Sequence, residues 1–564
     1  MVESTSMLEV LRIIRRYVEK KTINIEKVNF DILLSNDEKV LNDIIEESDT
    51  KKRVTLIYLY SNEAFMSDKN KHKESLIEYF KTLELKDFQL KKGIEVATNA
   101  DVLAREDAKE IISLIVNAKE DYQAYRGSDV ATNADVLARE DAKEIISLIV
   151  NAKGDYQAKY GSDIAIDSDI LAREDAKEII SLIVNAKGYY QASHGSEVAT
   201  NARVLAREDY REILDLIVNT KEDYQASHGS MVATNADVLA REDAKEIISL
   251  IVNAKEDYQA SYGSYVATNS KVLAREDAKE IISLIVNAKE HCQAEYGSIV
   301  ARNADVLARE DAKKIISLIV NAKGGAQARH GSYVATNSKV LAREDAKEII
   351  SLIVNAKEDY QAEYGSVVAR NADVLAREDA KKIISLIVNA KGGAQARHGS
   401  YVATNSKVLA REDAKEIISL IVNAKEDYQA EYGSVVARNA DILARKDYRE
   451  ILDLIVNAKE NYQAEYGSIV ARNADVLARE DYREILYLIV NTEGIKQIQH
   501  GTFLATDKKL LASDDYREQL YLALASLTNL YHSKFCSNAY LKFMGELEKS
   551  SDEEINQFIK KFKK

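Results

Sequence analysis

A chain of 564 residues is too long for one hydrophobic core, so it must fold as several domains or as an array of small units. Its composition, 46% hydrophobic and 30% charged, excludes intrinsic disorder, and the absence of proline favours long helical stretches. With 92 acidic against 78 basic residues the formal charge is -14, which argues against a broad surface for nucleic-acid phosphates.

The first 95 residues differ from the rest and are expected to form a helical N-terminal capping domain. Apolar residues recur at helical spacing in LEVLRIIRRYVEKK, DEKVLNDIIEE, KRVTLIYLYSNEAF and ESLIEYFKTLEL. The opening segment lacks the basic-then-apolar order of a secretory signal, and no apolar stretch in the chain approaches 18 residues. We therefore expect no membrane insertion, and a protein that acts in the cytoplasm or is delivered to a host cell.

Residues 96–527 form a tandem repeat with a constant period of 34 residues. Twelve copies begin at Val96, Val130, Ile164, Val198, Val232, Val266, Val300, Val334, Val368, Val402, Val436 and Val470, and a degraded thirteenth begins near Leu504. Residues 300–367 and 368–435 are identical, which indicates a recent two-repeat duplication. Because such units bury their apolar faces on their neighbours, we predict an all-α fold: an α-solenoid of 34-residue helix-turn-helix repeats with helical N- and C-terminal caps.

Each copy is predicted to hold one long and one short helix. In the first copy Asp107 is placed to be the N-cap of the long helix, with Glu110 completing a capping box. Gly127 suits the left-handed position that ends a helix, and Ser128 can cap the next one. The predicted core residues are Ala108, Ile111, Ile112, Ile115, Ala118 and Tyr122 of the long helix, and Val130, Ala131, Ala134, Leu137 and Ala138 of the short one.

Two known classes of helical repeat have a similar length. The period equals that of tetratricopeptide repeats, but the proline and tryptophan of that pattern are absent here, so only the architecture is similar. Transcription-activator-like DNA readers carry a variable residue pair in the loop between their helices. Here Arg105 and Glu106 occupy the corresponding turn and are nearly constant from copy to copy, which counts against such a code.

The remaining segment, residues 528–564, is expected to form a helical C-terminal cap. Its segments NAYLKFMGELEK and DEEINQFIKKFKK have helical spacing of apolar residues. The last helix is basic, but its apolar face is small, so a solvated cap is favoured over a membrane anchor.

Variation between copies concentrates at a few positions near the turn into the short helix. Where Asp129 stands in one copy, others carry large apolar residues, and Thr132 and Asp135 are elsewhere replaced by Arg or Lys. Arg302 is followed one turn later by Asp305, so an intrahelical ion pair is possible. The candidate partner-binding residues are Met231, Tyr265, Ile299, Arg302, Tyr333, Lys339, Val367, Arg370, Tyr401, Lys407, Val435 and Arg438.

Three interpretations of this variation remain open. The positions are a recognition surface with one set of contacts per repeat, a solvated face that drifts without constraint, or apolar residues that pack between adjacent repeats.

Catalytic, cofactor-binding and metal-binding residues are not expected. His194, His228, His330, His398 and His500 precede the repeat glycine and exchange with tyrosine in other copies, which favours a packing role. As metal ligands they would be one repeat apart, about 8 to 10 Å, which is too far for one ion. Phosphate-binding loops, zinc-ligand spacings and nucleophile elbows are absent from the sequence, and a small catalytic domain within residues 1–95 is the remaining enzymatic alternative.

The leading hypothesis is a non-catalytic scaffold that binds a protein or peptide partner through a surface shared by successive repeats. The recent duplication suggests a chain under diversifying pressure, such as a host-directed effector or an antigen. The alternative is a modular nucleic-acid-binding protein with one contact per repeat, which the overall acidity disfavours.

Overall fold

The computed structural model describes residues 5–84, 86–513, 516, 520 and 524, and all regular structure within them is helical. The chain divides into two compact units, Met1–Asn287 and Ala288–Lys564. In each unit, successive helices pack on their neighbours along the chain, so the predicted all-α solenoid is confirmed. The helices predicted between residues 538 and 564 lie outside the described residues.

Each repeat holds three helices and not the predicted two. In one copy these are α30 (Ala346–Val354), α31 (Asp359–Ala369) and α32 (Ala372–Leu375), which we call A-type, B-type and C-type. The predicted long helix is divided in two: α30 ends at Val354, and α31 begins at Asp359. The start of α31 is fixed by a capping box, in which the Gln361 side-chain oxygen accepts from the backbone N–H groups of Lys357 and Glu358. Asn371 then caps the C-type helix by accepting from the N–H of Val374 at 3.0 Å.

In the first unit the helices preceding the regular repeats are α1 (Thr5–Glu19), η1 (Ile25–Lys27), α2 (Phe30–Ser35), α3 (Glu38–Glu46), α4 (Thr50–Tyr60), α5 (Glu63–Met66), α6 (Lys73–Thr82), α7 (Asp87–Ala97) and α8 (Ala100–Leu103). The A-type helices that follow are α9 (Ala108–Val116), α12 (Ala142–Val150), α15 (Ala176–Val184), α18 (Tyr210–Val218), α21 (Ala244–Val252) and α24 (Ala278–Val286). The B-type helices are α10 (Asp121–Ala131), α13 (Asp155–Ala165), α16 (Tyr189–Ala199), α19 (Asp223–Ala233) and α22 (Asp257–Ala267). The C-type helices are α11 (Ala134–Leu137), α14 (Ser168–Leu171), α17 (Ala202–Leu205), α20 (Ala236–Leu239) and α23 (Ser270–Leu273).

In the second unit the other A-type helices are α27 (Ala312–Val320), α33 (Ala380–Val388), α36 (Ala414–Val422), α39 (Tyr448–Val456) and α42 (Tyr482–Val490). The other B-type helices are α25 (His291–Ala301), α28 (Gly325–Ala335), α34 (Gly393–Ala403), α37 (Asp427–Ala437), α40 (Asn461–Ala471) and α43 (Ile495–Thr506). The other C-type helices are α26 (Ala304–Leu307), α29 (Ser338–Leu341), α35 (Ser406–Leu409), α38 (Ala440–Leu443), α41 (Ala474–Leu477) and α44 (Lys508–Leu511).

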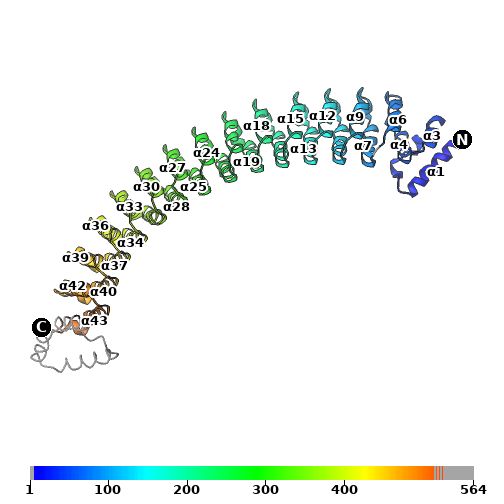
Figure 1. Cartoon of the computed structure of the whole chain (residues 1–564). Helices are drawn as coiled ribbons and strands as arrows, with labels where there is room; N and C mark the ends of the chain where they lie inside the picture. Colours follow the sequence, from blue (N-terminus) through cyan, green and yellow to red (C-terminus); the bar gives the residue numbers. More distant parts are fainter. Residues whose placement is uncertain (1–4, 85, 514–515, 517–519, 521–523, 525–564) are drawn as a thin grey trace, which may run out of the picture. The chain divides into compact units, whose positions relative to one another are not determined.

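Within each unit the A-type helices form one row and the B-type helices another (Figure 1). A B-type helix packs against the B-type helix and the A-type helix of the next repeat, as α31 does against α34 and α33. The predicted core residues Ala108, Ile111, Ile112 and Ile115 are completely buried, and Ala118 is buried as well. Tyr122 is only half-buried.

The predicted helix end at the repeat glycine is wrong. Gly127 lies inside α10, and every described glycine has a negative φ. At the equivalent Gly365, a Cβ would lie 2.6 Å from Val388 Cγ2 and 2.9 Å from Ile353 Cδ1. The glycine therefore lets two A-type helices approach the B-type helix, and it has no turn-forming role.

Two further predictions about the repeat are corrected. The Asp107 side chain makes no cap bond, because the Arg105 guanidinium takes both carboxylate oxygens, with Nε 2.8 Å from Oδ1 and Nη2 3.0 Å from Oδ2. Ala134 and Ala138 are exposed, and Val136 is buried beside Leu137. The reason is that the chain turns at Asn133 and starts the C-type helix with a new face toward the core.

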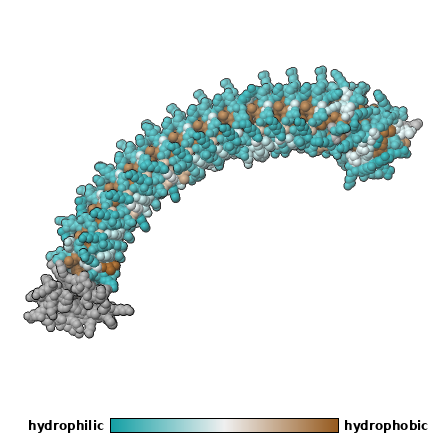
Figure 2. Space-filling view, viewed as in Figure 1, coloured by the Kyte–Doolittle hydropathy of each residue, from teal (hydrophilic) through white to brown (hydrophobic). Residues whose placement is uncertain are grey.

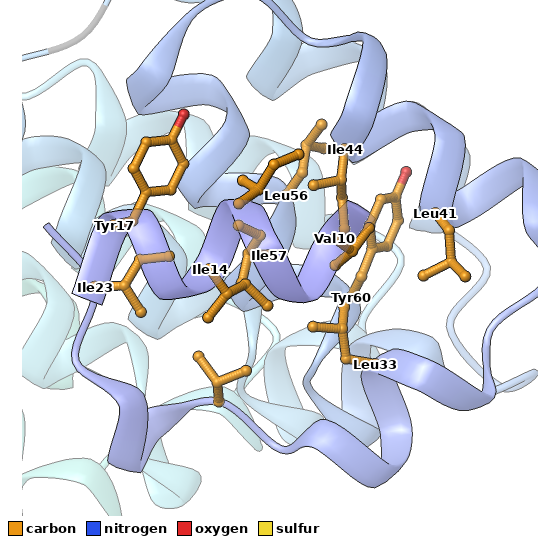
Figure 3. Close-up of a cluster of buried hydrophobic side chains, with 12 residues drawn as sticks. Val10, Ile14, Tyr17, Ile23, Leu33, Leu41, Ile44, Leu56, Ile57 and Tyr60 are labelled. Atoms are coloured by element: carbon orange, nitrogen blue, oxygen red, sulfur yellow. The ribbon is translucent and has the colours of Figure 1, made fainter. Parts of the chain in front are cut away.

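The N-terminal segments fold into the predicted helices around a cluster of buried side chains (Figure 3). Val10, Ile14 and Tyr17 of α1 face Ile44 of α3 and Ile57 of α4 there. The predicted helix over residues 52–65 is interrupted, because Asn62 caps α5 by accepting from the N–H of Phe65. Helices α3, α4 and α5 have 9, 11 and 4 residues, the lengths of α30, α31 and α32. The three-helix order therefore begins before the sequence repeat does.

Candidate partner-binding surface

The apolar candidates lie at the ninth position of the B-type helices, and we call them the B-face row. Met231 and Tyr265 are exposed in the first unit; Ile299, Tyr333, Val367 and Tyr401 are exposed in the second, and Val435 is half-buried. Val367 is 43% exposed, whereas Val368 and Ala369 beside it are completely buried. The exposed members are therefore not enclosed between repeats, although part of each side chain is covered by its neighbours.

The row also holds a residue that was not among the candidates. Ile469 of α40 continues it in the second unit and is 39% exposed. From Ile299 to Ile469, six successive B-type helices thus each present one apolar side chain at the same position. The sequence signal was present, since Ile469 aligns with Val435 at the 34-residue period.

Arg302, Arg370 and Arg438 follow directly after B-type helices and close the ends of these helices. Their Nε atoms donate to the carbonyls of Ser298, Ser366 and Ser434 at 3.1–3.2 Å. In copies with threonine at this position, the hydroxyl donates to the same carbonyl, as Thr336 does to Ser332 at 2.9 Å. The exchange of Thr for Arg thus preserves a helix C-cap bond. The possible intrahelical pair of Arg302 with Asp305 is wrong, because Asn303 separates α25 from α26.

Tyr333 and Tyr401 are each held between two arginines. Arg329 Nε donates to the Tyr333 hydroxyl at 2.9 Å, and Arg370 of the next repeat places its guanidinium 5.5 Å from the ring centroid. Arg397 and Arg438 hold Tyr401 in the same way, at 2.9 and 5.6 Å. These contacts fix exposed aromatic rings next to guanidinium groups, a combination that suits protein recognition.

Lys339 and Lys407 are exposed in C-type helices, at positions that hold aspartate in the alternate copies. The alternation extends to whole repeats. Residues 312–345 contain six basic and two acidic residues, whereas residues 346–379 contain four basic and seven acidic ones. Residues 380–413 repeat the sequence of 312–345, so two basic repeats are separated by an acidic one. Successive repeats of the second unit therefore alternate in charge.

The histidines before the repeat glycine contact the next repeat, as their predicted packing role implies. His330 Nδ1 lies 3.3 Å from Ser366 Oγ, His398 Nδ1 lies 3.3 Å from Ser434 Oγ, and His194 Nδ1 lies 3.1 Å from Ser230 Oγ. Burial lowers the pKa of His330 and His398 below the ordinary value of 6.5. Among the described residues, histidine, cysteine, aspartate and glutamate do not gather in groups of three or more that could hold a metal ion.

The sequence reasoning missed a groove along the A-type helices of the first unit. It has a volume of about 1290 Å³ and follows α12, α15, α18, α21 and α24. The floor of the groove is formed by the half-buried leucine at the seventh position of successive helices, for example Leu182 and Leu250. Its rims carry pairs of one basic and one acidic residue, such as Lys245 and Glu246. The net charge of this groove changes little from copy to copy, so it lacks the variation that marks the B-face row.

On the face seen in Figure 2, each unit presents small hydrophobic patches at regular intervals, bordered by hydrophilic side chains. Together with the helix packing, this defines the class of protein: an all-helical repeat scaffold. Neither a protein-family model nor a curated protein sequence matches the chain. In the part of the chain that the structure describes, no helix is both long and apolar enough to span a bilayer.

Proposed function

We propose that the chain is a non-catalytic scaffold that binds a protein or peptide partner through the B-face row. The observation that carries this proposal is the sequence of exposed apolar side chains, Ile299, Tyr333, Val367 and Tyr401, on neighbouring helices of the second unit. Exposed apolar residues that follow one another on neighbouring helices are typical of a contact surface. Repeat arrays use such surfaces to hold extended partners.

A non-catalytic role is supported by the way the polar groups are used. The recurring Arg and Asp of each turn bind each other, as Arg377 and Asp379 do, and the recurring Gln caps a helix. An active site requires unlike groups that converge at one place. Here the same groups are distributed along an array. A host-directed effector or antigen is the role that we favour, because of the recent duplication of residues 300–367.

A photo-crosslinking amino acid at Val367 tests the proposed surface. We expect adducts with one or a few proteins in a lysate of the source organism or of its host, and the double change Tyr333→Ser and Tyr401→Ser should reduce their yield. Glu348, exposed on the A-type helix of the same repeat, is the matched control position. Adducts from position 348 together with none from position 367 would show that the B-face row is not the binding surface.

Nucleic-acid binding remains the second candidate, because Arg370 follows a B-type helix and Lys339 and Lys407 are exposed on C-type helices. It is disfavoured by Glu363 and Asp373 of the intervening acidic repeat, since a nucleic-acid strand presents an uninterrupted row of phosphates. In a gel-shift titration with single- and double-stranded probes at several salt concentrations, we expect no specific retardation. Retardation that weakens steeply as salt rises would favour this second function.

A further inference from the structure

A tyrosine stands at the second position of most B-type helices and links two repeats. The Tyr360 hydroxyl donates to the carbonyl of Lys391 in the next repeat at 3.1 Å, and the Tyr428 hydroxyl donates to that of Lys459 at 2.6 Å. In the first unit Tyr224 donates to Lys255 in the same way at 2.8 Å. Most B-type helices of the array thus have a phenol ring at their start that reaches the next repeat.

This ring is missing from α34, where the sequence Glu-Asp-Tyr of the neighbouring copies is replaced by Gly392, Gly393 and Ala394. A hollow of about 420 Å³ lies there, between α31, α34 and α37. Its aromatic wall is formed by Tyr360 and Tyr364, and its rim carries Arg397, His398, Asp427 and Glu431. Gly393 adds no side chain beside the Tyr360 ring, and a Cβ there would lie 3.9 Å from that ring, at ordinary contact distance.

The neighbouring repeats show which group fits this hollow. At the equivalent places in α31 and α37 the space is filled by the chain's own tyrosine, whose hydroxyl reaches the carbonyl of the following turn. In α34 the corresponding carbonyl is that of Lys425, and Ala394 has no hydroxyl to offer it. A phenol supplied from outside would restore both the ring contacts and this hydrogen bond.

We propose that the hollow at Ala394 receives a tyrosine side chain of the bound partner, which replaces the tyrosine that this repeat lacks. The inference rests on the proposed function, since it names the anchor residue of a partner on the B-type helices. The carboxylates of Asp427 and Glu431 on the rim favour a basic residue beside that tyrosine. Arg397 belongs both to this rim and to the Tyr401 pair, so the hollow adjoins the B-face row.

The chain contains an internal comparison for this site. Helix α28 starts with the same residues, Gly324, Gly325 and Ala326, but the preceding repeat has Cys292 where Tyr360 stands. The cysteine sulfur would lie 3.2 Å from a Cβ on Gly325, so this place has a thiol in the position of the aromatic wall. We therefore expect weaker phenol binding at Ala326 than at Ala394.

The test uses 4-fluorophenol as the probe and the full chain, followed by fluorine NMR. We expect saturable binding with a dissociation constant on the order of millimolar, as is usual for so small a ligand. Ala394→Tyr fills the hollow with the residue that the sister repeats carry, and it should weaken binding at least tenfold while circular dichroism stays unchanged.

Fluorobenzene, which lacks the hydroxyl, is the matched control ligand. We expect it to bind several-fold more weakly, because it cannot donate to the Lys425 carbonyl. The proposal is overturned if 4-fluorophenol does not bind saturably, or if Ala394→Tyr leaves its binding unchanged. If Ala394→Tyr abolishes phenol binding but crosslinking from position 367 persists at full yield, the tyrosine anchor is wrong and the proposed scaffold function stands.

Discussion

Arg377 holds two repeats together and shows how one residue type stabilises the array. Its guanidinium binds both oxygens of Asp379, with Nε 2.7 Å from Oδ1, and Nη1 donates to the carbonyls of Leu409 and Arg411 in the next repeat. The two side chains are 20% and 25% exposed, so water competes only partly for these bonds. Arginine is required because a lysine ammonium cannot form this planar fork. The hydrogen bond from Arg377 also lowers the pKa of Asp379.

Changing Arg377 to lysine is expected to loosen the contact between two repeats. The loss of the fork and of the carbonyl bonds should cost about 1 to 3 kcal/mol of unfolding free energy. Amide hydrogen exchange should report it as faster exchange in residues 370–415. Arg302→Lys is the control, because the Nε of that arginine donates to a carbonyl at the end of its own helix, and it should cost less than about 1 kcal/mol. Equal effects of the two changes would contradict the proposed role of the fork.

His398 makes the stability of its repeat dependent on pH. Ser434 Oγ donates to the Glu431 carbonyl, so the imidazole donates to Ser434 from Nδ1. Burial lowers the pKa of His398; Arg397 and Arg438 lower it further, and Glu431 and Asp427 oppose the shift. Because the folded pKa lies below the unfolded value of about 6.5, the stabilisation is complete above that pH and is lost as the pH falls through the folded pKa.

His398→Tyr should therefore reduce the loss of stability on acidification from pH 7.5 to pH 5. Tyrosine occupies this position in neighbouring copies, as Tyr364 and Tyr432, so the fold accepts it. Urea unfolding at both pH values measures the effect, with His291→Tyr, at the more exposed start of α25, as the control. An unchanged pH dependence in the His398 variant would contradict this assignment.

At the scale of the helix, the start of each B-type helix depends on the residue before it. With Glu358 at the N-cap, the Gln361 oxygen accepts two backbone N–H groups and its nitrogen donates to the Ala390 carbonyl at 2.8 Å. With Gly392 at the N-cap, the Gln395 oxygen is buried without a partner, and its nitrogen reaches the Ala424 carbonyl only at 3.3 Å. A buried oxygen without a hydrogen bond is destabilising.

Gly392→Glu should restore the capping box and stabilise the repeat by about 0.5 to 2 kcal/mol. A Cβ at position 392 would meet only the end of the flexible Gln395 side chain, which moves into its capping position in the sister repeats. Thermal and urea unfolding measure the gain. Glu358→Gly is the reverse change in the neighbouring repeat and should destabilise by a similar amount. The capping account fails if both variants shift stability in the same direction.

At the scale of the whole chain, each repeat contacts mainly its neighbours, so stability is expected to be a sum of repeat and interface contributions. The identical blocks 300–367 and 368–435 make the same contacts. Arg329 binds Tyr333 and Arg397 binds Tyr401 at the same distance of 2.9 Å. A block can therefore be removed without creating a new kind of junction.

Deleting residues 368–435 should leave a folded array with an unchanged helical signal per residue. The denaturant dependence of unfolding should fall in proportion to the surface removed. Circular dichroism and urea titration test this. A deletion of about one and a half repeats, starting at the same residue, breaks the 34-residue register and should lose helical signal. If both deletions behave alike, nearest-neighbour packing does not govern this chain.

The amino-acid sequence by itself determined the helical solenoid, its period and the core of its A-type helices. Ile111, Ile112 and Ile115 recur at helical spacing, and apolar residues in this pattern are buried against the adjacent helices of any packed array. The variable positions could also be found from the sequence, because comparison of twelve copies needs no coordinates. The hollow at Ala394 was not predicted: the exchange of Tyr for Ala is visible when the copies are compared, but it does not show that the freed space stays open.

Only the tertiary structure decided what the polar and small residues do. The local sequence around Gly127 is compatible with a helix end and with close helix packing. The structure shows close packing, because Val150 of the next repeat and Ile115 lie against the glycine. Asp107 does not cap a helix, because its carboxylate binds the Arg105 guanidinium. Burial of apolar residues follows from local periodicity. The space around Gly127 depends instead on Val150 of the next repeat, and the Arg105 guanidinium is held beside Asp107 by the Arg139 carbonyl of the next repeat, neither of which the local pattern specifies.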